Sequence, residues 1–167
     1  MNLEEAIKTA IDFEEQVSEV YRQAMEQTSD PIGRRIFGVL ADEELKHLNY
    51  LTSRLDELQR TGGITAEQLD TAVPSQQKIR DGISRLEGRM SQEDKGSELQ
   101  MLSKALKVEH DTVNFYRRMV SELSAEGQDV FARFVEIEEG HLALVQAEID
   151  YVSKTGYWFD IKEFDME

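Results

Sequence analysis

The sequence predicts an all-α protein: a four-helix bundle of two antiparallel helix hairpins joined by a long crossover, with short crossover helices and a C-terminal tail. Four long stretches carry apolar residues at alternating spacings of three and four, the pattern of helices that bury one face in a bundle. Short breaks separate the first stretch from the second and the third from the fourth, and such connections join antiparallel neighbours. About 35 residues separate the second stretch from the third, enough to return the chain along the bundle. The second and third helices are therefore expected to be parallel.

The composition narrows the class of function. The chain of 167 residues fits one domain, residues 1–167, and its 34 acidic and 19 basic residues give a formal charge of −15. This charge disfavours nucleic acid and anionic membrane surfaces as partners and attracts cations. There is no cysteine, which excludes disulfides, thiolate zinc sites and iron–sulfur clusters. No stretch resembles a signal peptide or a membrane span, so we expect a cytoplasmic protein with no nucleic-acid or membrane partner.

The first hairpin is predicted from a helix over residues 2–28 and a second over residues 31–60. Asn2, followed three residues later by Glu5, has the form of an N-cap with its reciprocal partner. Asp30 is the expected N-cap of the second helix, and the proline that follows it suits a first helical turn.

The crossover is predicted at residues 62–96, beginning with two glycines that end the second helix. Thr65 with Gln68 suggests a short capped turn. An amphipathic helix between Pro74 and Gly96 is indicated by four apolar residues, Ile79, Ile83, Leu86 and Met90.

The second hairpin is predicted from helices over residues 97–123 and 125–154, with Ser124 as the N-cap of the latter. The tail, residues 156–167, is expected to pack on the bundle because it carries several large apolar residues: Tyr157, Trp158, Phe159, Ile161 and Phe164.

One glutamate interrupts each of the four apolar stripes: Glu14, Glu44, Glu109 and Glu138. In each hairpin the two glutamates are equally far from the connecting turn, so we expect them to lie level across the helix pair. Two of them begin a Glu-x-x-His pattern, which adds His47 and His141. The two hairpins thus form an internal repeat with an offset of about 95 residues.

These six residues predict a site for two metal ions. Four ionised carboxylates in an apolar core would cost several kcal/mol each unless a positive charge compensated them. Two divalent cations would cancel the four charges, with two neutral imidazoles completing the ligand set. Carboxylate and imidazole ligands without sulfur suit iron or manganese, and zinc can also bind them. One glutamate from each of two helices plus a Glu-x-x-His from each of the others is the ligand pattern of dimetal helix bundles.

At these residues the sequence resembles the ferritin-like superfamily, and within it most closely the rubrerythrin-like branch. The similar segments are FEEQVSEVY, ADEELKHL, KVEHDTVNFY and VEIEEGHLAL, one on each main helix. The resemblance implies a single ferritin-like domain with two iron ions. It assigns the four stripe glutamates as ligating or bridging catalytic carboxylates and His47 and His141 as terminal ligands. It also implies that Tyr21 and Tyr116 hydrogen-bond to ligand carboxylates.

The sequence departs from rubrerythrins at two points. Rubrerythrins carry a second glutamate three residues after the ligand of the third helix, where this chain has Thr112. The remaining six-ligand set is more similar to that of bacterioferritin, although the long crossover is not. The cysteine-containing rubredoxin-like domain is also absent, so electrons are expected to come from an external donor.

Other polar residues near the stripes have simpler interpretations. Four acids are expected on solvated faces: Glu15, Glu43, Glu139 and Asp111. Glu43 would replace Glu44 as a ligand if the second helix were rotated. Glu148 is expected at a wet end of the bundle. His110 lies beside the ligand stripe and is expected to flank the ligands or to contact them, not to be a primary ligand. The stripes offer little positive charge beyond Arg54, which lies about two turns beyond His47.

Three functions remain open at this point. The leading hypothesis is a non-haem di-iron oxidoreductase that reduces peroxide or dioxygen, in which the carboxylates change between bridging and terminal binding as the iron charge changes. The second is a ferroxidase that stores or delivers iron, and the third is a helical interaction protein in which metal acts only as a staple. A homodimer or a larger homo-oligomer is expected.

Overall fold

The computed structural model describes residues 1–65, 69–85 and 95–160. Over these ranges the regular structure is entirely helical, which confirms the prediction of an all-α protein. The helices are α1 (Leu3–Gln27), α2 (Pro31–Thr61), α3 (Gln76–Arg85), α4 (Gly96–Glu122) and α5 (Ala125–Thr155). None of the helices in this described part has both the length and the apolar character needed to cross a membrane.

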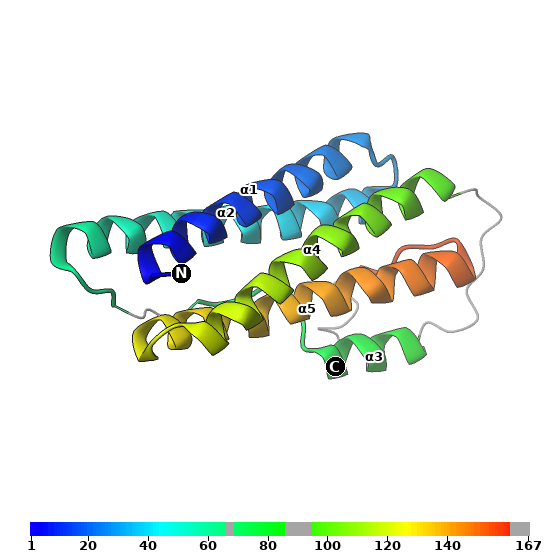
Figure 1. Ribbon diagram of the computed structural model, residues 1–167. Helices are drawn as coiled ribbons and strands as arrows, with labels where there is room; N and C mark the ends of the chain where they lie inside the picture. Colours follow the sequence, from blue (N-terminus) through cyan, green and yellow to red (C-terminus); the bar gives the residue numbers. More distant parts are fainter. Residues whose placement is uncertain (66–68, 86–94, 161–167) are drawn as a thin grey trace.

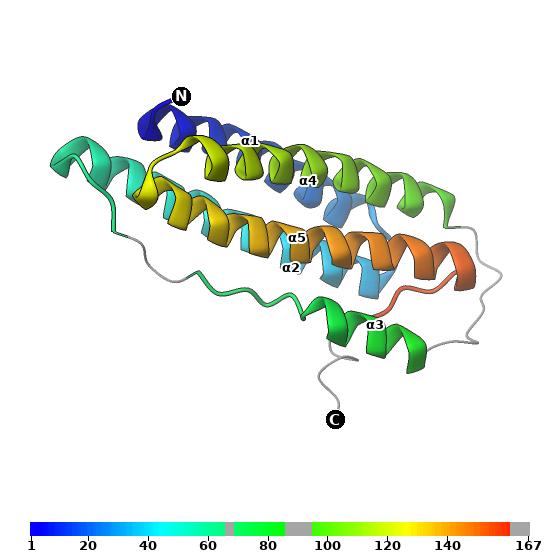
Figure 2. The ribbon, with the colours of Figure 1, turned by 60° about the horizontal axis from the view of Figure 1, so that its bottom comes forward.

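The four long helices form a bundle of two hairpins. Helix α1 packs on α2, α4 packs on α5, and α1 also packs on α4 (Figure 1). Within each hairpin the helices run in opposite directions, whereas α2 and α4 run in the same direction (Figure 1). The connection between α2 and α4 therefore spans the length of the bundle, and its short helix α3 lies beside α5 (Figure 2).

The helix ends follow the local signals in the sequence. Asn2 and Glu5 form a reciprocal capping box, in which each backbone N–H donates to the other's side chain at 3.0 and 2.8 Å. The Asp30 carboxylate accepts from the backbone N–H groups of Ile32 and Gly33 at the start of α2. Gly62 ends α2 with a φ of 82°, a conformation that glycine adopts without a steric penalty. Ser124 precedes α5, but its side chain makes no capping hydrogen bond.

The apolar core consists of two clusters separated by a charged layer. One cluster contains Ile7 and Ala10 of α1, and the other contains Val17 and Tyr21 of the same helix, with Glu14 between them. The other three long helices repeat this arrangement, because Glu44, Glu109 and Glu138 also fall between residues of the two clusters. The apolar layers above and below hold the bundle together and keep water from the glutamates.

The crossover helix α3 lies within the predicted segment. Ile79 is buried in one of the apolar clusters and Ile83 packs against it, as the amphipathic pattern predicted. Leu86 and Met90, and the Gln68 of the expected capped turn, lie outside the described residues.

The described part of the tail folds back onto the bundle. Trp158 is 1% exposed, its indole N–H donates to Glu98 at 3.1 Å, and its ring meets Phe37 edge-on at 5.3 Å. Phe159 is fully buried, which agrees with the expectation that the tail packs, while Ile161 and Phe164 lie outside the described residues.

The tail also corrects one prediction. Glu148 was expected at a wet end of the bundle, but it is fully buried and accepts a hydrogen bond from the backbone N–H of Phe159 at 3.1 Å. The helical pattern of α5 could not reveal this environment, because the tail that covers Glu148 comes from beyond the end of the helix.

Candidate metal centre

Six buried residues from the four long helices meet in the charged layer between the apolar clusters. None of them is more than 1% exposed, and they are Glu14, Glu44, His47, Glu109, Glu138 and His141. Their ligand atoms form two groups whose members lie within 4.8 Å of one another. We call these six residues the Glu/His cluster. The sequence prediction that the four stripe glutamates and two histidines converge is confirmed.

The two groups share two glutamates. The first group contains Glu14 and His47, the second contains Glu109 and His141, and both contain Glu44 and Glu138. Hydrophobic periodicity placed all six residues at one level but did not distinguish the shared pair from the others.

Glu44 and Glu138 each turn one oxygen toward either histidine. In Glu44, Oε1 lies 2.8 Å from Nδ1 of His141, and Oε2 lies 3.2 Å from Nδ1 of His47. In Glu138, Oε1 lies 2.9 Å from Nδ1 of His47, and Oε2 lies 3.2 Å from Nδ1 of His141. A carboxylate whose oxygens face two separate ligand groups is suited to bridge two cations.

Glu14 and Glu109 each belong to one group. Glu14 Oε2 lies 3.6 Å from Nδ1 of His47, and Glu109 Oε1 lies 3.3 Å from Nδ1 of His141. The two imidazole rings are almost parallel, with centroids 5.7 Å apart and planes inclined by 9°. The cluster therefore has two similar halves, as the internal repeat in the sequence predicted.

Two tyrosines hydrogen-bond to the unshared glutamates. The Tyr21 hydroxyl donates to Glu109 at 2.5 Å, and the Tyr116 hydroxyl donates to Glu14. Burial raises the pKa of both phenols well above the ordinary value, and the nearby carboxylates raise it further. Both phenols therefore remain protonated, and each keeps the O–H that donates its hydrogen bond. The hydrogen bonds to carboxylates that the family resemblance implied are present.

Several polar atoms of the cluster lie close to one another but make no hydrogen bond of suitable geometry within the described residues. They are one oxygen each of Glu14, Glu44 and Glu109, both oxygens of Glu138, and both ring nitrogens of His47. A buried polar atom without a partner costs about 1–3 kcal/mol, and more when the group is charged. Cations coordinated by these atoms would compensate this cost, so the residues present fit a pair of metal ions.

Burial and mutual repulsion set the protonation of the cluster without metal. Burial raises the pKa of Glu14 and Glu109 well above 4.5, and the charges of Glu138 and Glu44 raise it further. Burial also acts to raise the pKa of Glu138, but attraction to His141 and His47 outweighs it and holds that pKa well below the ordinary value.

Burial and the neighbouring charges act on the pKa of the two histidines in the opposite directions from those for Glu138. Burial acts to lower the pKa of His47 and His141, but the surrounding carboxylates raise it well above 6.5. For Glu44, burial and Glu138 act to raise the pKa, yet the interactions with Glu14 and the histidines lower it overall. Without metal, the cluster therefore favours the protonated form of both histidines and of Glu14 and Glu109, and the ionised form of Glu44 and Glu138.

Glu43 is not on a solvated face, which corrects the sequence prediction. It is 2% exposed and accepts hydrogen bonds from the hydroxyl of Thr71 and from the backbone N–H of Ala72 at 3.0 Å. Its Oε1 also lies 3.1 Å from Nε2 of His141. Burial acts to raise its pKa, but His141, Thr71 and Ala72 together lower it. The crossover covers this carboxylate, a contact that helical periodicity could not predict, and Glu44 remains the residue that faces the cluster.

The remaining candidates lie outside the cluster. Glu15, Asp111 and His110 are exposed, and the half-exposed Glu139 pairs with Arg117 at 2.6 Å. The other residues of interest are engaged elsewhere: Arg54 donates to the backbone oxygen of Thr65 at 2.6 Å, and Thr112 donates to that of Val108 at 2.8 Å.

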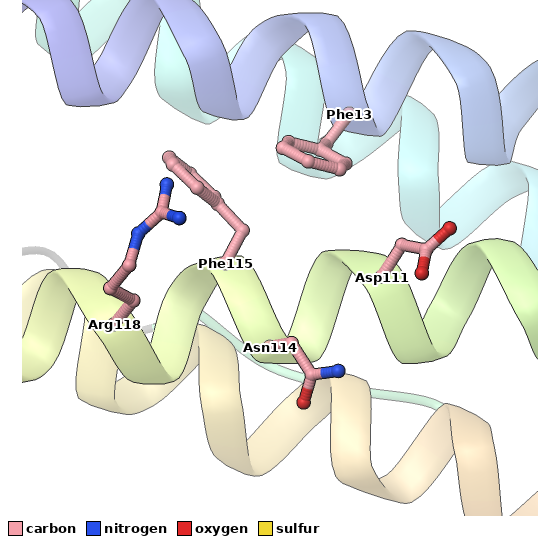
Figure 3. Close-up of a pocket in the computed structure, with 5 residues that line it drawn as sticks. All are labelled: Phe13, Asp111, Asn114, Phe115 and Arg118. Atoms are coloured by element: carbon pink, nitrogen blue, oxygen red, sulfur yellow. The ribbon is translucent and has the colours of Figure 1, made fainter.

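A separate hollow of about 360 Å³ lies on the outer surface of the α1–α4 pair (Figure 3). It is lined by two stacked rings, Phe13 and Phe115, with centroids 4.9 Å apart, and by Asp111, Asn114 and Arg118. The Arg118 guanidinium lies 5.7 Å from the ring of Phe115. This hollow shares no residue with the Glu/His cluster and offers only one carboxylate, so it is not a second metal-ligand set.

Comparisons with protein-family models, with curated proteins and with solved structures found no match for this chain. We therefore infer function from the chemistry of the cluster.

Proposed function

We propose that this protein is a ferritin-like di-iron oxidoreductase, of the rubrerythrin-like branch, that reduces peroxide or dioxygen with electrons from an external donor. The observation that carries the proposal is the arrangement of Glu44 and Glu138. Each turns one oxygen toward the group containing His47 and the other toward the group containing His141. Two cations held side by side by common ligands are suited to reactions that need two electrons.

The proposed site uses six ligands. Glu14 and His47 would help to hold one ion and Glu109 and His141 the other, and Glu44 and Glu138 belong to both ligand groups. Because these ligands are oxygen and nitrogen atoms without sulfur, the chemistry of the set favours iron or manganese, with zinc as a redox-inactive occupant. When bound as Fe(II), the two ions would supply one electron each, so one peroxide and two protons would give two waters.

The protein holds the ligand carboxylates in place and excludes water from the cluster. Tyr21 and Tyr116 hold the unshared carboxylates through hydrogen bonds, and the phenols stay protonated at neutral pH because burial raises their pKa. Apolar residues on both sides of the layer, including Phe134, Tyr116 and Leu40, are fully buried. In such a site the unpaired carboxylate oxygens attract cations strongly, because water does not screen them.

The test is anaerobic loading of the metal-free protein with two Fe(II) per chain, followed by one equivalent of hydrogen peroxide. We expect Fe(II) to be oxidised much faster than in buffer, with two Fe(II) consumed per peroxide. A reduced viologen dye should then restore Fe(II) and allow repeated turnover. Air-saturated buffer in place of peroxide gives the corresponding test for dioxygen.

Two variants test whether the fast oxidation depends on the Glu/His cluster. The double variant Glu138→Ala, His141→Ala should abolish the fast oxidation, whereas Glu139→Ala, on the exposed side of the same helix turn, should leave it unchanged. Oxidation by the wild-type protein that is no faster than in buffer would contradict the proposal. Tight binding of zinc and iron without any turnover would instead support a structural metal.

Iron handling is a second candidate, favoured by the formal charge of −15, which attracts cations. In this case the same cluster would oxidise Fe(II) for storage or delivery. Native mass measurement separates the two candidates, because storage requires a closed shell of many subunits and a dimer cannot form one.

A further inference from the structure

Glu43 makes the two halves of the cluster different. Its carboxylate is almost completely buried, and Oε1 lies 3.1 Å from Nε2 of His141. That nitrogen is on the opposite side of the ring from Nδ1, which faces Glu44 at 2.8 Å. The imidazole of His141 is therefore held between a carboxylate behind it and the ligand group in front of it.

His47 has no such support. Its Nε2 is buried and lacks a hydrogen-bond partner within the part of the chain that the structure describes. The ring instead meets Phe134 edge-on, with centroids 5.2 Å apart. The internal repeat explains the difference, because the position equivalent to Glu43 in the second half is the buried, apolar Ile137.

The crossover fixes the Glu43 carboxylate. The Thr71 hydroxyl and the Ala72 backbone N–H both donate to it, and Thr71 also accepts from the N–H of Val73 at 3.1 Å. A carboxylate held by two donors from another segment cannot easily turn away from the imidazole. The crossover is thus connected to one half of the cluster through Glu43.

A carboxylate behind a metal-binding imidazole has known physical effects. It fixes the tautomer that leaves Nδ1 free for the cation, restricts rotation of the ring and strengthens electron donation to the cation. Removal of such a partner typically lowers metal affinity by about 10–100-fold.

We propose that Glu43 is a positioning residue for His141 and makes the two cation positions unequal, with the position formed by Glu44, Glu109, Glu138 and His141 the tighter one. This inference rests on the dimetal site of the proposed function. It adds an order of filling: the His141 position binds first, and the His47 position binds second and releases its cation more readily.

In the test, the metal-free protein is titrated with Co(II) alone. Calorimetry and the visible absorption spectrum monitor the binding. The wild-type protein should bind two ions in two resolved steps. Glu43→Gln should weaken the tighter step by about 10–100-fold and leave the weaker step unchanged, so that the two steps merge. Glutamine keeps an oxygen that can accept from Thr71 and Ala72, but it lacks the charge and directs an amide N–H₂ at the imidazole.

Thr71→Val is the matched control. It removes one hydrogen bond between Glu43 and the crossover but leaves the carboxylate beside His141, so the tighter step should change by only a few-fold. If the role of Glu43 were only to connect α2 to the crossover, Glu43→Gln and Thr71→Val would weaken the tighter Co(II) step to a similar extent, which would overturn the inference.

A spectroscopic measurement separates positioning from a general loss of structure. In the Co(II) protein, the proton on Nε2 of a bound histidine gives a paramagnetically shifted NMR signal. The His141 proton should exchange slowly with water in the wild type, and in Glu43→Gln its signal should shift and exchange faster. The His47 signal should be unaffected.

Single-histidine variants assign the steps even if Glu43→Gln does not fold. His47→Ala should retain one ion with the affinity of the tighter wild-type step, and His141→Ala should retain one ion with that of the weaker step. Two equal steps in the wild type, or the reverse assignment, would overturn the inference. Wild-type protein that binds no Co(II) would overturn the proposed function as well, whereas two ions bound with no effect of Glu43→Gln would overturn only the inference.

Discussion

The Tyr21 hydroxyl donates to Glu109 at 2.5 Å, although Tyr21 lies two turns from Glu14 on its own helix. The reciprocal bond joins Tyr116 to Glu14. Each hairpin therefore positions the unshared glutamate of the other, and the two halves of the cluster form one hydrogen-bonded unit.

Tyr21→Phe should destabilise the metal-free protein by about 1–3 kcal/mol, because a buried carboxyl loses its donor. Urea unfolding measures this change. A double-mutant cycle with Glu109→Ala, which removes the acceptor, should give a coupling energy between about 0.5 and 3 kcal/mol. Tyr21→Phe combined with Glu139→Ala, a half-exposed residue that shares no partner with Tyr21, should be additive. A coupling energy near zero with Glu109 would show that the hydrogen bond makes no net contribution.

Shared and unshared glutamates should differ in metal content. Glu44→Ala and Glu138→Ala each remove a ligand from both groups and should lower the affinity of both ions. Glu14→Ala and Glu109→Ala each remove a ligand from one group and should leave about one ion per chain. Elemental analysis after exhaustive dialysis measures the content. Equal losses in all four variants would contradict the bridging role of Glu44 and Glu138.

Metal loading should release protons. Without metal, the raised pKa values of His47, His141, Glu14 and Glu109 favour the protonated form of each group, and cations must displace the protons that these groups hold. Protons should therefore be released as the cations bind near neutral pH. Calorimetry with Zn(II) in buffers of different ionisation enthalpy counts these protons. Binding without proton release would mean that all four groups are already deprotonated.

The stability of the metal-free protein should fall as the pH rises above neutrality. The pKa of each histidine is well above its unfolded value of 6.5, so its contribution is complete below pH 6.5 and is lost as the pH rises through the folded value. The raised pKa of Glu14 and Glu109 acts in the same direction. Glu138 acts oppositely, because its lowered pKa gives stability that is lost as the pH falls below 4.5.

Metal should reverse the alkaline trend, since cations bind the deprotonated ligands. Urea midpoints measured with and without Zn(II) from about pH 6 to pH 9 test both statements. If the Zn(II)-bound protein also lost stability at alkaline pH, the loss would arise from groups outside the Glu/His cluster.

Two glycines should respond in opposite ways to a methyl group. In Gly33→Ala the new Cβ would lie 2.7 Å from Cε2 of Trp158 and 2.8 Å from Cγ2 of Thr28, so we expect a loss of about 1–3 kcal/mol. Gly140→Ala meets nothing within 4 Å inside α5 and should stabilise the protein by about 0.5–1 kcal/mol. Thermal unfolding compares the two. A neutral Gly33→Ala would contradict close packing of the tail on α2.

The helix caps and the depth of the cluster could be predicted because they depend on neighbours in sequence. Asn2, Asp30 and Gly62 act within one helical turn, and the spacing of Glu44 from His47 places both on one helix face. The equal distances of Glu14 and Glu44 from their turn fixed their common level, since both helices rise by the same amount per residue.

The contacts of Glu43 and Glu148 could not be predicted in this way. Each is covered by a segment distant in sequence, Glu43 by Thr71 and Ala72 of the crossover and Glu148 by the backbone of Phe159. Neither segment has a periodic pattern that reports where it packs.

The sequence by itself determined the helices, their caps and the common depth of four glutamates and two histidines, because helical geometry converts spacing into position. Only the tertiary structure decided which glutamates are shared, which tyrosine reaches which carboxylate, and that His141 alone of the two histidines has Glu43 behind it. These features depend on the rotation of each helix about its axis and on the path of the crossover. Both are set by packing between distant segments, which local spacing does not encode.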